Sequence, residues 1–159
     1  MDPLLELLKL NARESIDTLA NMLNTTADDI RSRLTHLEKT GIIRGYQPIL
    51  NRDELNAEHV TAIIEVKLIP ERGGGFNHLA MRISRFPEVT SAMLVSGQAD
   101  LLLFVEGRNL REVAQFVSER LTTIPGVTAT STSFMLKTYK HQGVLMESQD
   151  ETERLSVSP

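Results

Sequence analysis

The spacing of apolar residues changes along this chain near residue 59. Over the first forty residues, apolar side chains recur at intervals of three and four, which places them on one face of an α-helix. From Val60 to Leu68 they instead alternate with mostly polar residues, the pattern of a β-strand with one buried face. This change predicts a helical first part and a second part built on a sheet, which together make an α+β fold.

Three helices are predicted in the first part. The first covers residues 4–10, where leucines form one apolar side. Ser15 has the side chain to cap a second helix. Thr26 and Asp29 have the spacing of a capping box at the start of a third helix, and Gly41 follows the last turn of that helix as a left-handed stop. Two short helices joined by a tight turn predict a helix-turn-helix.

The residues after Gly41 alternate around Gly45 and predict a small hairpin over residues 42–50, a wing beside the third helix. The first domain, residues 1–50, is therefore interpreted as a winged helix-turn-helix, whose second motif helix enters the DNA major groove. Polar side chains at the start, on the outer side and just beyond the end of that helix are the predicted DNA contacts: Thr26, Asp28, Arg31, Ser32, Arg33, Thr35, His36, Lys39 and Arg44.

The charge distribution agrees with a DNA-binding first domain. The whole chain has a formal net charge of −4, yet residues 30–52 hold five basic residues and one acidic residue. Such a run favours contact with a phosphate backbone, although it is also common on a solvated helix face. The chain has no cysteine, no apolar run long enough for a membrane span and no visible signal peptide, so we expect a soluble cytoplasmic protein that does not bind membranes.

The second part predicts a ferredoxin-like sandwich. Residues 51–58 are polar and are interpreted as a hinge, and residues 59–140 as one βαββαβ domain. Its strands and helices are expected, in order, over residues 59–68, 76–83, 89–95, 100–106, 109–121 and 127–139. An internal echo supports two related halves, because the seven residues from Phe86 resemble the seven from Ile124. Residues 141–159 are acidic and rich in serine, which predicts a flexible tail.

One strand of this domain predicts how the protein associates with a second copy of itself. Residues 101–105 are apolar on both faces, the pattern of a strand that is buried on both sides. In a ferredoxin-like sandwich the helices cover only one face of the sheet. A second copy of the same sheet is the simplest cover for the other face, so the sequence predicts a homodimer through this domain.

Three runs in this order resemble the Lrp/AsnC (leucine-responsive, feast–famine) family of bacterial and archaeal transcription regulators. They are residues 34–46, residues 86–89 and residues 96–103, and the resemblance covers about residues 2–140. It implies a helix-turn-helix followed by a ferredoxin-like domain of the RAM/ACT-like type. It also implies double-stranded DNA as partner, dimers that assemble into tetramers or octamers, and a small effector, usually an amino acid, that alters assembly or DNA affinity.

The turn at residues 96–100 is the predicted effector site. Backbone amides at a glycine turn can hold a carboxylate, and Asp100 can pair with an ammonium group, a match for an α-amino acid. The alternative is a plain hairpin turn in which Asp100 satisfies its own backbone. The predicted effector residues are Ser96, Gly97, Gln98, Ala99 and Asp100.

Two positions depart from the family pattern. Asp28 and Asp29 stand where the family usually has uncharged residues. Carboxylates there suit the helix dipole but would repel phosphates, although either one can accept a hydrogen bond from a cytosine amine. Ala99 stands where an aromatic residue is frequent, which removes a stacking wall from the effector site. These departures motivate an alternative: an amino-acid sensor or partner subunit with weak or lost DNA binding.

Other classes of protein fit less well. The four histidines have no metal-ligand spacing, and the chain shows no nucleophile–base pair, so neither an enzyme nor a cofactor is expected. The three glycines at residues 73–75 lack the lysine and spacing of a phosphate-binding loop. An RNA-binding sheet would need stacking aromatics where residues 101–103 are leucines.

Overall fold

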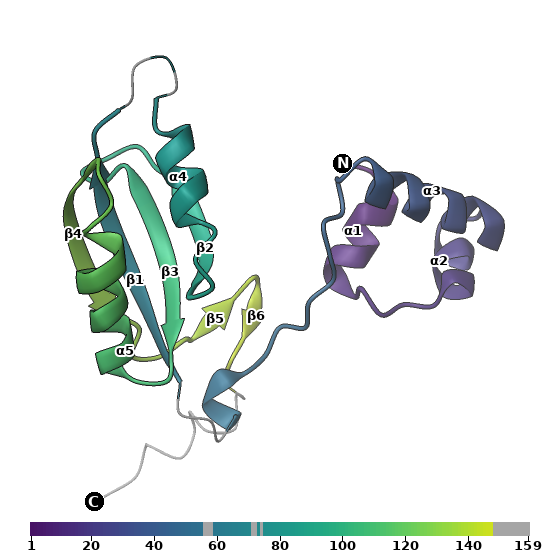
Figure 1. Ribbon diagram of the computed structural model, residues 1–159. Helices are drawn as coiled ribbons and strands as arrows, with labels where there is room; N and C mark the ends of the chain where they lie inside the picture. The colour runs from purple at the N-terminus through teal and green to yellow at the C-terminus, as the bar shows by residue number, and fades with distance from the viewer. Residues whose placement is uncertain (56–58, 71–72, 74, 148–159) are drawn as a thin grey trace, which may run out of the picture. The chain divides into compact units, whose positions relative to one another are not determined.

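The computed structural model describes residues 1–55, 59–70, 73 and 75–147. The chain divides into two compact units, residues 1–50 and residues 51–159, drawn in Figure 1. Within the described ranges, no helix is both long enough and apolar enough to cross a membrane. Each unit has its own buried apolar cluster.

The first unit consists of the three predicted helices, α1 (Pro3–Leu10), α2 (Ile16–Met22) and α3 (Ala27–Lys39). Each helix begins at a side-chain cap, as predicted for Ser15 and Thr26, while Asp2 caps α1 by accepting a 2.9 Å hydrogen bond from the Leu4 amide. Gly41, with φ +72°, follows the end of α3. The helices pack around a small core of Leu4, Leu19, Ala20, Ile30 and Leu37.

The predicted wing hairpin is wrong in its secondary structure, because residues 43–50 form no strand pairing. Gly45 does not adopt a positive φ, so it does not make the tight turn that a two-residue hairpin needs. Pro48 has no amide to donate to a ladder. The segment is instead held at its start, where the Ile43 amide donates to the Leu37 carbonyl at 3.0 Å.

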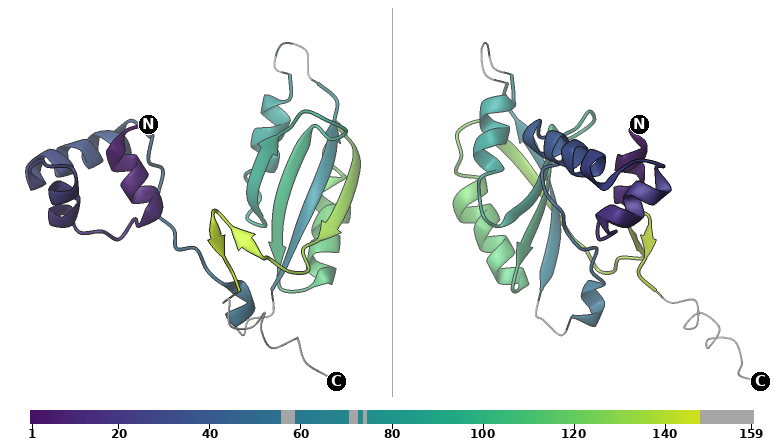
Figure 2. Two further views of the ribbon diagram at one scale, coloured as in Figure 1. Left: turned by 180° about the vertical axis from the view of Figure 1, so that it is seen from behind. Right: turned by 90° about the vertical axis from the view of Figure 1, so that its right-hand side faces the viewer.

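The second unit has the predicted strand, helix, strand, strand, helix, strand order of a ferredoxin-like fold. Its strands are β1 (Val60–Leu68), β2 (Val89–Leu94), β3 (Leu101–Gly107) and β4 (Val127–Phe134). They form an antiparallel sheet in the order β2-β3-β1-β4. Both helices lie on one face of this sheet, as the right-hand view of Figure 2 shows. The last strand ends at Phe134, not at Tyr139 as predicted. The helices are α4 (Asn77–Ile83) and α5 (Leu110–Gln115), and α5 continues as the π-helical segment η2 (Phe116–Leu121).

Alternation along the strands separates a buried face from an open face. Alternate residues of β1 and β3 lie under the two helices, and Ile64 and Leu103 among them are fully buried. The residues between them point to the other face, where the β3 residues Leu102 and Phe104 pair with Glu65 and Ile63 of β1. These open-face apolar side chains are only partly buried in the single chain.

The C-terminal part of the second unit corrects the predicted tail. Lys140–His141 (β5) and Val144–Leu145 (β6) pair as a small antiparallel hairpin, seen in yellow-green in Figure 1. Gln142 and Gly143 between them both have positive φ, +46° and +89°, as in a two-residue type I′ turn. The tail therefore does not begin at residue 141, and the rest of it, residues 148–159, lies outside the described residues.

Candidate DNA-binding and effector-binding sites

Helix α3 carries the candidate DNA-binding surface. Eight of the nine predicted contact residues lie within α3 or at its N-cap, and Arg44 follows its C-terminal end. All nine are exposed except Arg33, which is half-buried. The cap fixes the start of the helix, since the Thr26 hydroxyl oxygen accepts from the Asp29 amide at 3.2 Å. The burial of Ile30 and Leu37 in the core directs the opposite side of α3 to solvent.

The two arginines at the centre of this surface have different roles. Arg31 is exposed, and its Nη1 lies 2.7 Å from Oδ1 of Asp28, one turn earlier on the same helix. Arg33 instead reaches out of α3, with Nη2 2.5 Å from Oδ1 of Asp2, the cap of α1, and Nη1 3.6 Å from Oδ2 of Asp29. Arg33 therefore joins α3 to the start of α1, and only Arg31 is presented to solvent.

The sequence did not separate these two arginines, because the Arg33–Asp2 contact joins residues 31 positions apart. The hydrogen bond made by the Asp29 side chain also differs from the prediction. Its carboxylate does not reach back to the amide of the cap residue, as a full capping box requires, but accepts from the Thr25 hydroxyl at 3.0 Å. Its side chain is therefore occupied with local structure.

The positive charge continues past the end of α3. Within the described part of the chain, Lys39 and Arg44 take part in no ion pair, so both ammonium and guanidinium groups are available to an anion. Tyr46 donates a 3.0 Å hydrogen bond to Glu38. Partial burial raises the pKa of Tyr46 above its usual value, and the Glu38 carboxylate raises it further. The hydrogen bond attaches the segment after α3 to the helix in place of a wing hairpin.

The predicted effector residues form the exposed turn between β2 and β3. Gly97 has φ +153°, and the amides of Gly97 and Gln98 donate no hydrogen bond within the described residues. The Asp100 carboxylate does not satisfy its own backbone, as the plain-turn alternative supposed. Its Oδ2 accepts from the Leu68 amide of β1 at 2.8 Å, and the Asp100 amide donates to the Val66 carbonyl at 3.0 Å. Ala99 is almost completely buried.

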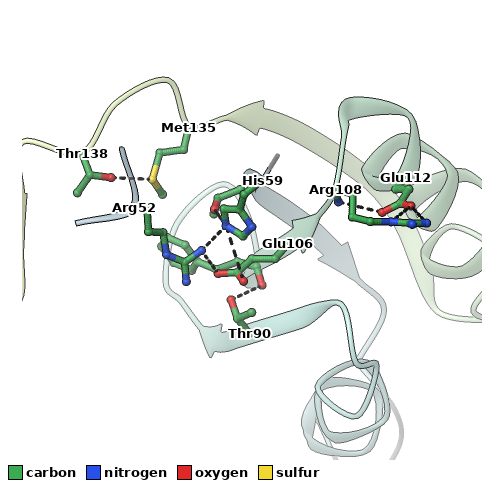
Figure 3. A network of polar contacts seen from close by, with 10 residues as sticks. Arg52, His59, Thr90, Glu106, Arg108, Glu112, Met135 and Thr138 are labelled. Atoms are coloured by element: carbon green, nitrogen blue, oxygen red, sulfur yellow. Dashed lines mark hydrogen bonds and ion pairs between the residues drawn. The ribbon is translucent and has the colours of Figure 1, made fainter. Parts of the chain in front are cut away.

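A network of polar contacts that the sequence did not indicate lies at the other end of β3 (Figure 3). Arg52, in the short helix η1 (Arg52–Glu54), has Nη1 2.6 Å from Oε1 of Glu106, and the His59 ring lies beside both groups. Close by, the Arg108 amide donates to Glu112 at 2.9 Å, and the Arg108 guanidinium lowers the pKa of that carboxyl group. No motif signals Arg52 and Glu106, because only the folded sheet brings them together.

The start of the predicted hinge belongs to the second unit. Besides Arg52, Asn51 donates a 2.9 Å hydrogen bond to the Met146 carbonyl of the C-terminal hairpin. Residues 56–58 of the predicted hinge lie outside the described residues. Among the residues that are described, no group of histidine, aspartate and glutamate side chains has an arrangement that could hold a metal ion.

A helix-turn-helix unit followed by a ferredoxin-like unit defines a class of HTH-type transcriptional regulators, and the comparisons agree. The uncharacterized HTH-type transcriptional regulator YugG of Bacillus subtilis is 40% identical over 98% of this chain and 95% of its own length. The model of the Lrp/AsnC ligand binding domain matches residues 61–145. The chain belongs to the Lrp/AsnC family, whose members are transcriptional regulators and not enzymes.

Solved structures show the same architecture. A transcriptional regulator of Neisseria meningitidis, crystallised as an L-Met complex, superimposes with a TM-score of 0.66 at 27% identity, covering 87% of this chain and 88% of that one. AsnC of E. coli has a TM-score of 0.66 at 22% identity over 87% of this chain and 91% of its own, which supports the fold alone. The proline dehydrogenase transcriptional activator of Rhizobium radiobacter is 27% identical over 89% of this chain and 90% of its own length.

Proposed function

We propose that the protein is a sequence-specific regulator that binds double-stranded DNA through α3 and works in the cytoplasm as a homodimer or a larger assembly. The observation that carries this proposal is the solvent side of α3. It presents Arg31, Ser32, Thr35, His36 and Lys39, which include residue types that contact phosphates and base edges in protein–DNA complexes. The buried side of the same helix anchors it rigidly to α1 and α2.

Recovery of genomic fragments tests the proposal. Purified protein is incubated with sheared DNA from its own genome at physiological salt, and bound fragments are sequenced. We expect enrichment of a few regions upstream of genes, and loss of most of that enrichment in Arg31→Ala, because this exposed arginine has no role in the core. Arg111→Ala, which removes an exposed arginine from α5, is the matched control and should leave the enrichment unchanged.

Failure to enrich any region, with all three proteins folded, would contradict sequence-specific binding. It would favour the alternative, a sensor or partner subunit with weak or lost DNA binding. The acidic first turn of α3, with Asp28 and Asp29 both exposed, is the observation that favours this alternative. Repeating the recovery with each of the twenty amino acids present distinguishes this outcome from a regulator that needs its effector before it binds DNA.

The effector is proposed to be an amino acid bound at residues 96–100. The exposed amides of Gly97 and Gln98 suit a carboxylate, and Asp100 has a second carboxylate oxygen beside the one that accepts from Leu68. The related regulator from Neisseria meningitidis was crystallised with L-Met, which supports an amino acid as the class of ligand. The site in a single chain is an open turn, so neighbouring protomers would supply its remaining walls.

Asp100→Asn separates the two roles of this carboxylate. The amide oxygen still accepts from the Leu68 amide, but the charge that would pair with an ammonium group is gone. We expect Asp100→Asn to keep its thermal stability and to lose any amino-acid-induced change in oligomer size, measured by sedimentation velocity. Asp100→Ala should lose the response and also about 1 to 3 kcal/mol of stability, because the Leu68 amide loses its acceptor.

An undiminished response in Asp100→Asn, to the same amino acid that acts on the parent protein, would show that the effector binds elsewhere. Gln98→Ala is the companion variant, because its exposed side chain makes no hydrogen bond within the described residues. It tests whether the turn, and not only Asp100, contributes to the response.

A further inference from the structure

Asp28 and Arg31 form an ion pair on the DNA-facing side of α3. The side chain of Asp28 is 92% exposed and that of Arg31 is 57% exposed, and they meet at 2.7 Å one helical turn apart. In the described residues Asp28 makes no other side-chain contact. The carboxylate occupies the position on Arg31 that a phosphate oxygen or a guanine edge would take in a DNA complex.

The neighbouring charged residues, unlike Asp28, are held by contacts within the first unit. Asp29 accepts from Thr25 and lies 3.6 Å from Arg33, and Arg33 is held by Asp2. Asp28 therefore has no part in capping α3 or in joining the helices of the first unit. Apart from the favourable position of its charge in the first turn of α3, Asp28 interacts within the described residues with Arg31, an exposed arginine of this surface. Asp28 therefore affects what Arg31 can bind.

We propose that Asp28 is a specificity-determining residue that competes with DNA phosphates for Arg31 and so keeps sequence-independent binding weak. This proposal rests on DNA binding by α3, as proposed above. An exposed pair of this kind is weak and exchanges readily, so DNA can displace the carboxylate. At an arbitrary sequence, displacement leaves Asp28 unpaired beside phosphates, which repel it.

A target DNA sequence can compensate for breaking the Asp28–Arg31 pair, which an arbitrary DNA sequence cannot. Once released, the Asp28 carboxylate can accept a hydrogen bond from the N4 amine of a cytosine, while Arg31 contacts a guanine edge or a phosphate. The penalty of breaking the pair is then offset only where the base sequence supplies the donor. The pair thus acts against non-specific binding more strongly than against binding at a target.

The test measures binding to a random-sequence DNA duplex by fluorescence anisotropy over a series of salt concentrations. The proteins are the parent, Asp28→Asn, Arg31→Ala, the double variant, and Glu119→Gln, which removes one charge from an exposed residue of the second unit. We expect Asp28→Asn to bind random DNA roughly 3- to 10-fold more tightly near 0.1 M salt. The slope of log K against log salt should steepen by about 0.9, because Arg31 now neutralises one more phosphate.

The double variant identifies the mechanism. If Asp28 acts through Arg31, the gain from Asp28→Asn disappears in the Arg31→Ala background, and Glu119→Gln binds random DNA as the parent does. An equal gain in both backgrounds would overturn the proposal, because Asp28 would then repel DNA without occupying Arg31. The proposal would also be overturned if the parent bound random DNA and Asp28→Asn bound it with the same affinity.

Two further measurements distinguish a failure of this proposal from a failure of DNA binding by α3. If neither the parent nor Asp28→Asn binds any duplex at 50 mM salt, DNA binding by α3 is itself refuted, and this inference falls with it. On fragments recovered from the genome, Asp28→Asn should gain less than on random DNA, so the ratio of specific to non-specific affinity falls. An unchanged ratio would contradict the proposed role in specificity.

Discussion

Replacing Leu102 with aspartate is expected to convert the protein to a monomer. Leu102 lies at the middle of the open face of the sheet, opposite Met93 of β2 and Glu65 of β1, and it is only partly buried within one chain. In a homodimer closed by this face, both protomers would place an unpaired carboxylate in the interface. Burial of such a charge without a partner raises the dissociation constant by roughly 100- to 1000-fold.

Sedimentation equilibrium of the parent and of Leu102→Asp measures this change directly. Met81→Asp is the matched control, because Met81 is 57% exposed on α4, which covers the opposite face of the sheet. A dimer that survives Leu102→Asp, with an unchanged thermal unfolding curve, would place the interface on another surface. Dissociation of both variants would indicate general destabilisation in place of a specific interface.

The sequence was sufficient for the order of the three N-terminal helices and of the βαββαβ elements, because each of these has a local signal. Alternation from Val60 to Leu68 specifies a strand with one buried face, and the structure confirms this in the complete burial of Ile64 and Val66. Ser15 and Thr26 signal helix starts through hydrogen bonds to amides only three residues away. Interactions of this kind are contained within a few residues, so they can be inferred before any tertiary structure is known.

The candidate site depends on contacts that no local pattern contains. Arg31 and Arg33 are the same residue type two positions apart, yet Arg33 is held by Asp2 and Arg31 is exposed. Nothing in the sequence around Asp100 indicates that its carboxylate accepts from the Leu68 amide, 32 residues earlier. The roles of these side chains are set by the packing of whole helices and strands, so the residue types could be predicted but not their partners.

The other large effect, on the free energy of unfolding, is expected at Gly126, which lies in the internal echo. The echo aligns Gly126 with Glu88, so one half has a glycine where the other half has a side chain. Gly126 has φ +98°, and a Cβ atom there would lie 2.7 Å from Cδ1 of Leu79 in α4. Its carbonyl accepts a 2.8 Å hydrogen bond from the Ile69 amide, so the backbone is held at the end of β1 and cannot easily shift away.

We therefore expect Gly126→Ala to lower the free energy of unfolding by roughly 2 to 5 kcal/mol, combining backbone strain with overpacking against Leu79. Gly143→Ala separates the two contributions. Gly143 has φ +89° but nothing within 4 Å of the added Cβ, so only the strain of about 1 to 2 kcal/mol applies there. Urea unfolding of both variants and the parent measures the difference. All three are compared at one protein concentration, because self-association would add to stability. Equal losses at the two positions would mean that α4 yields to the added methyl group, and that the close approach of Leu79 does not dictate glycine at residue 126.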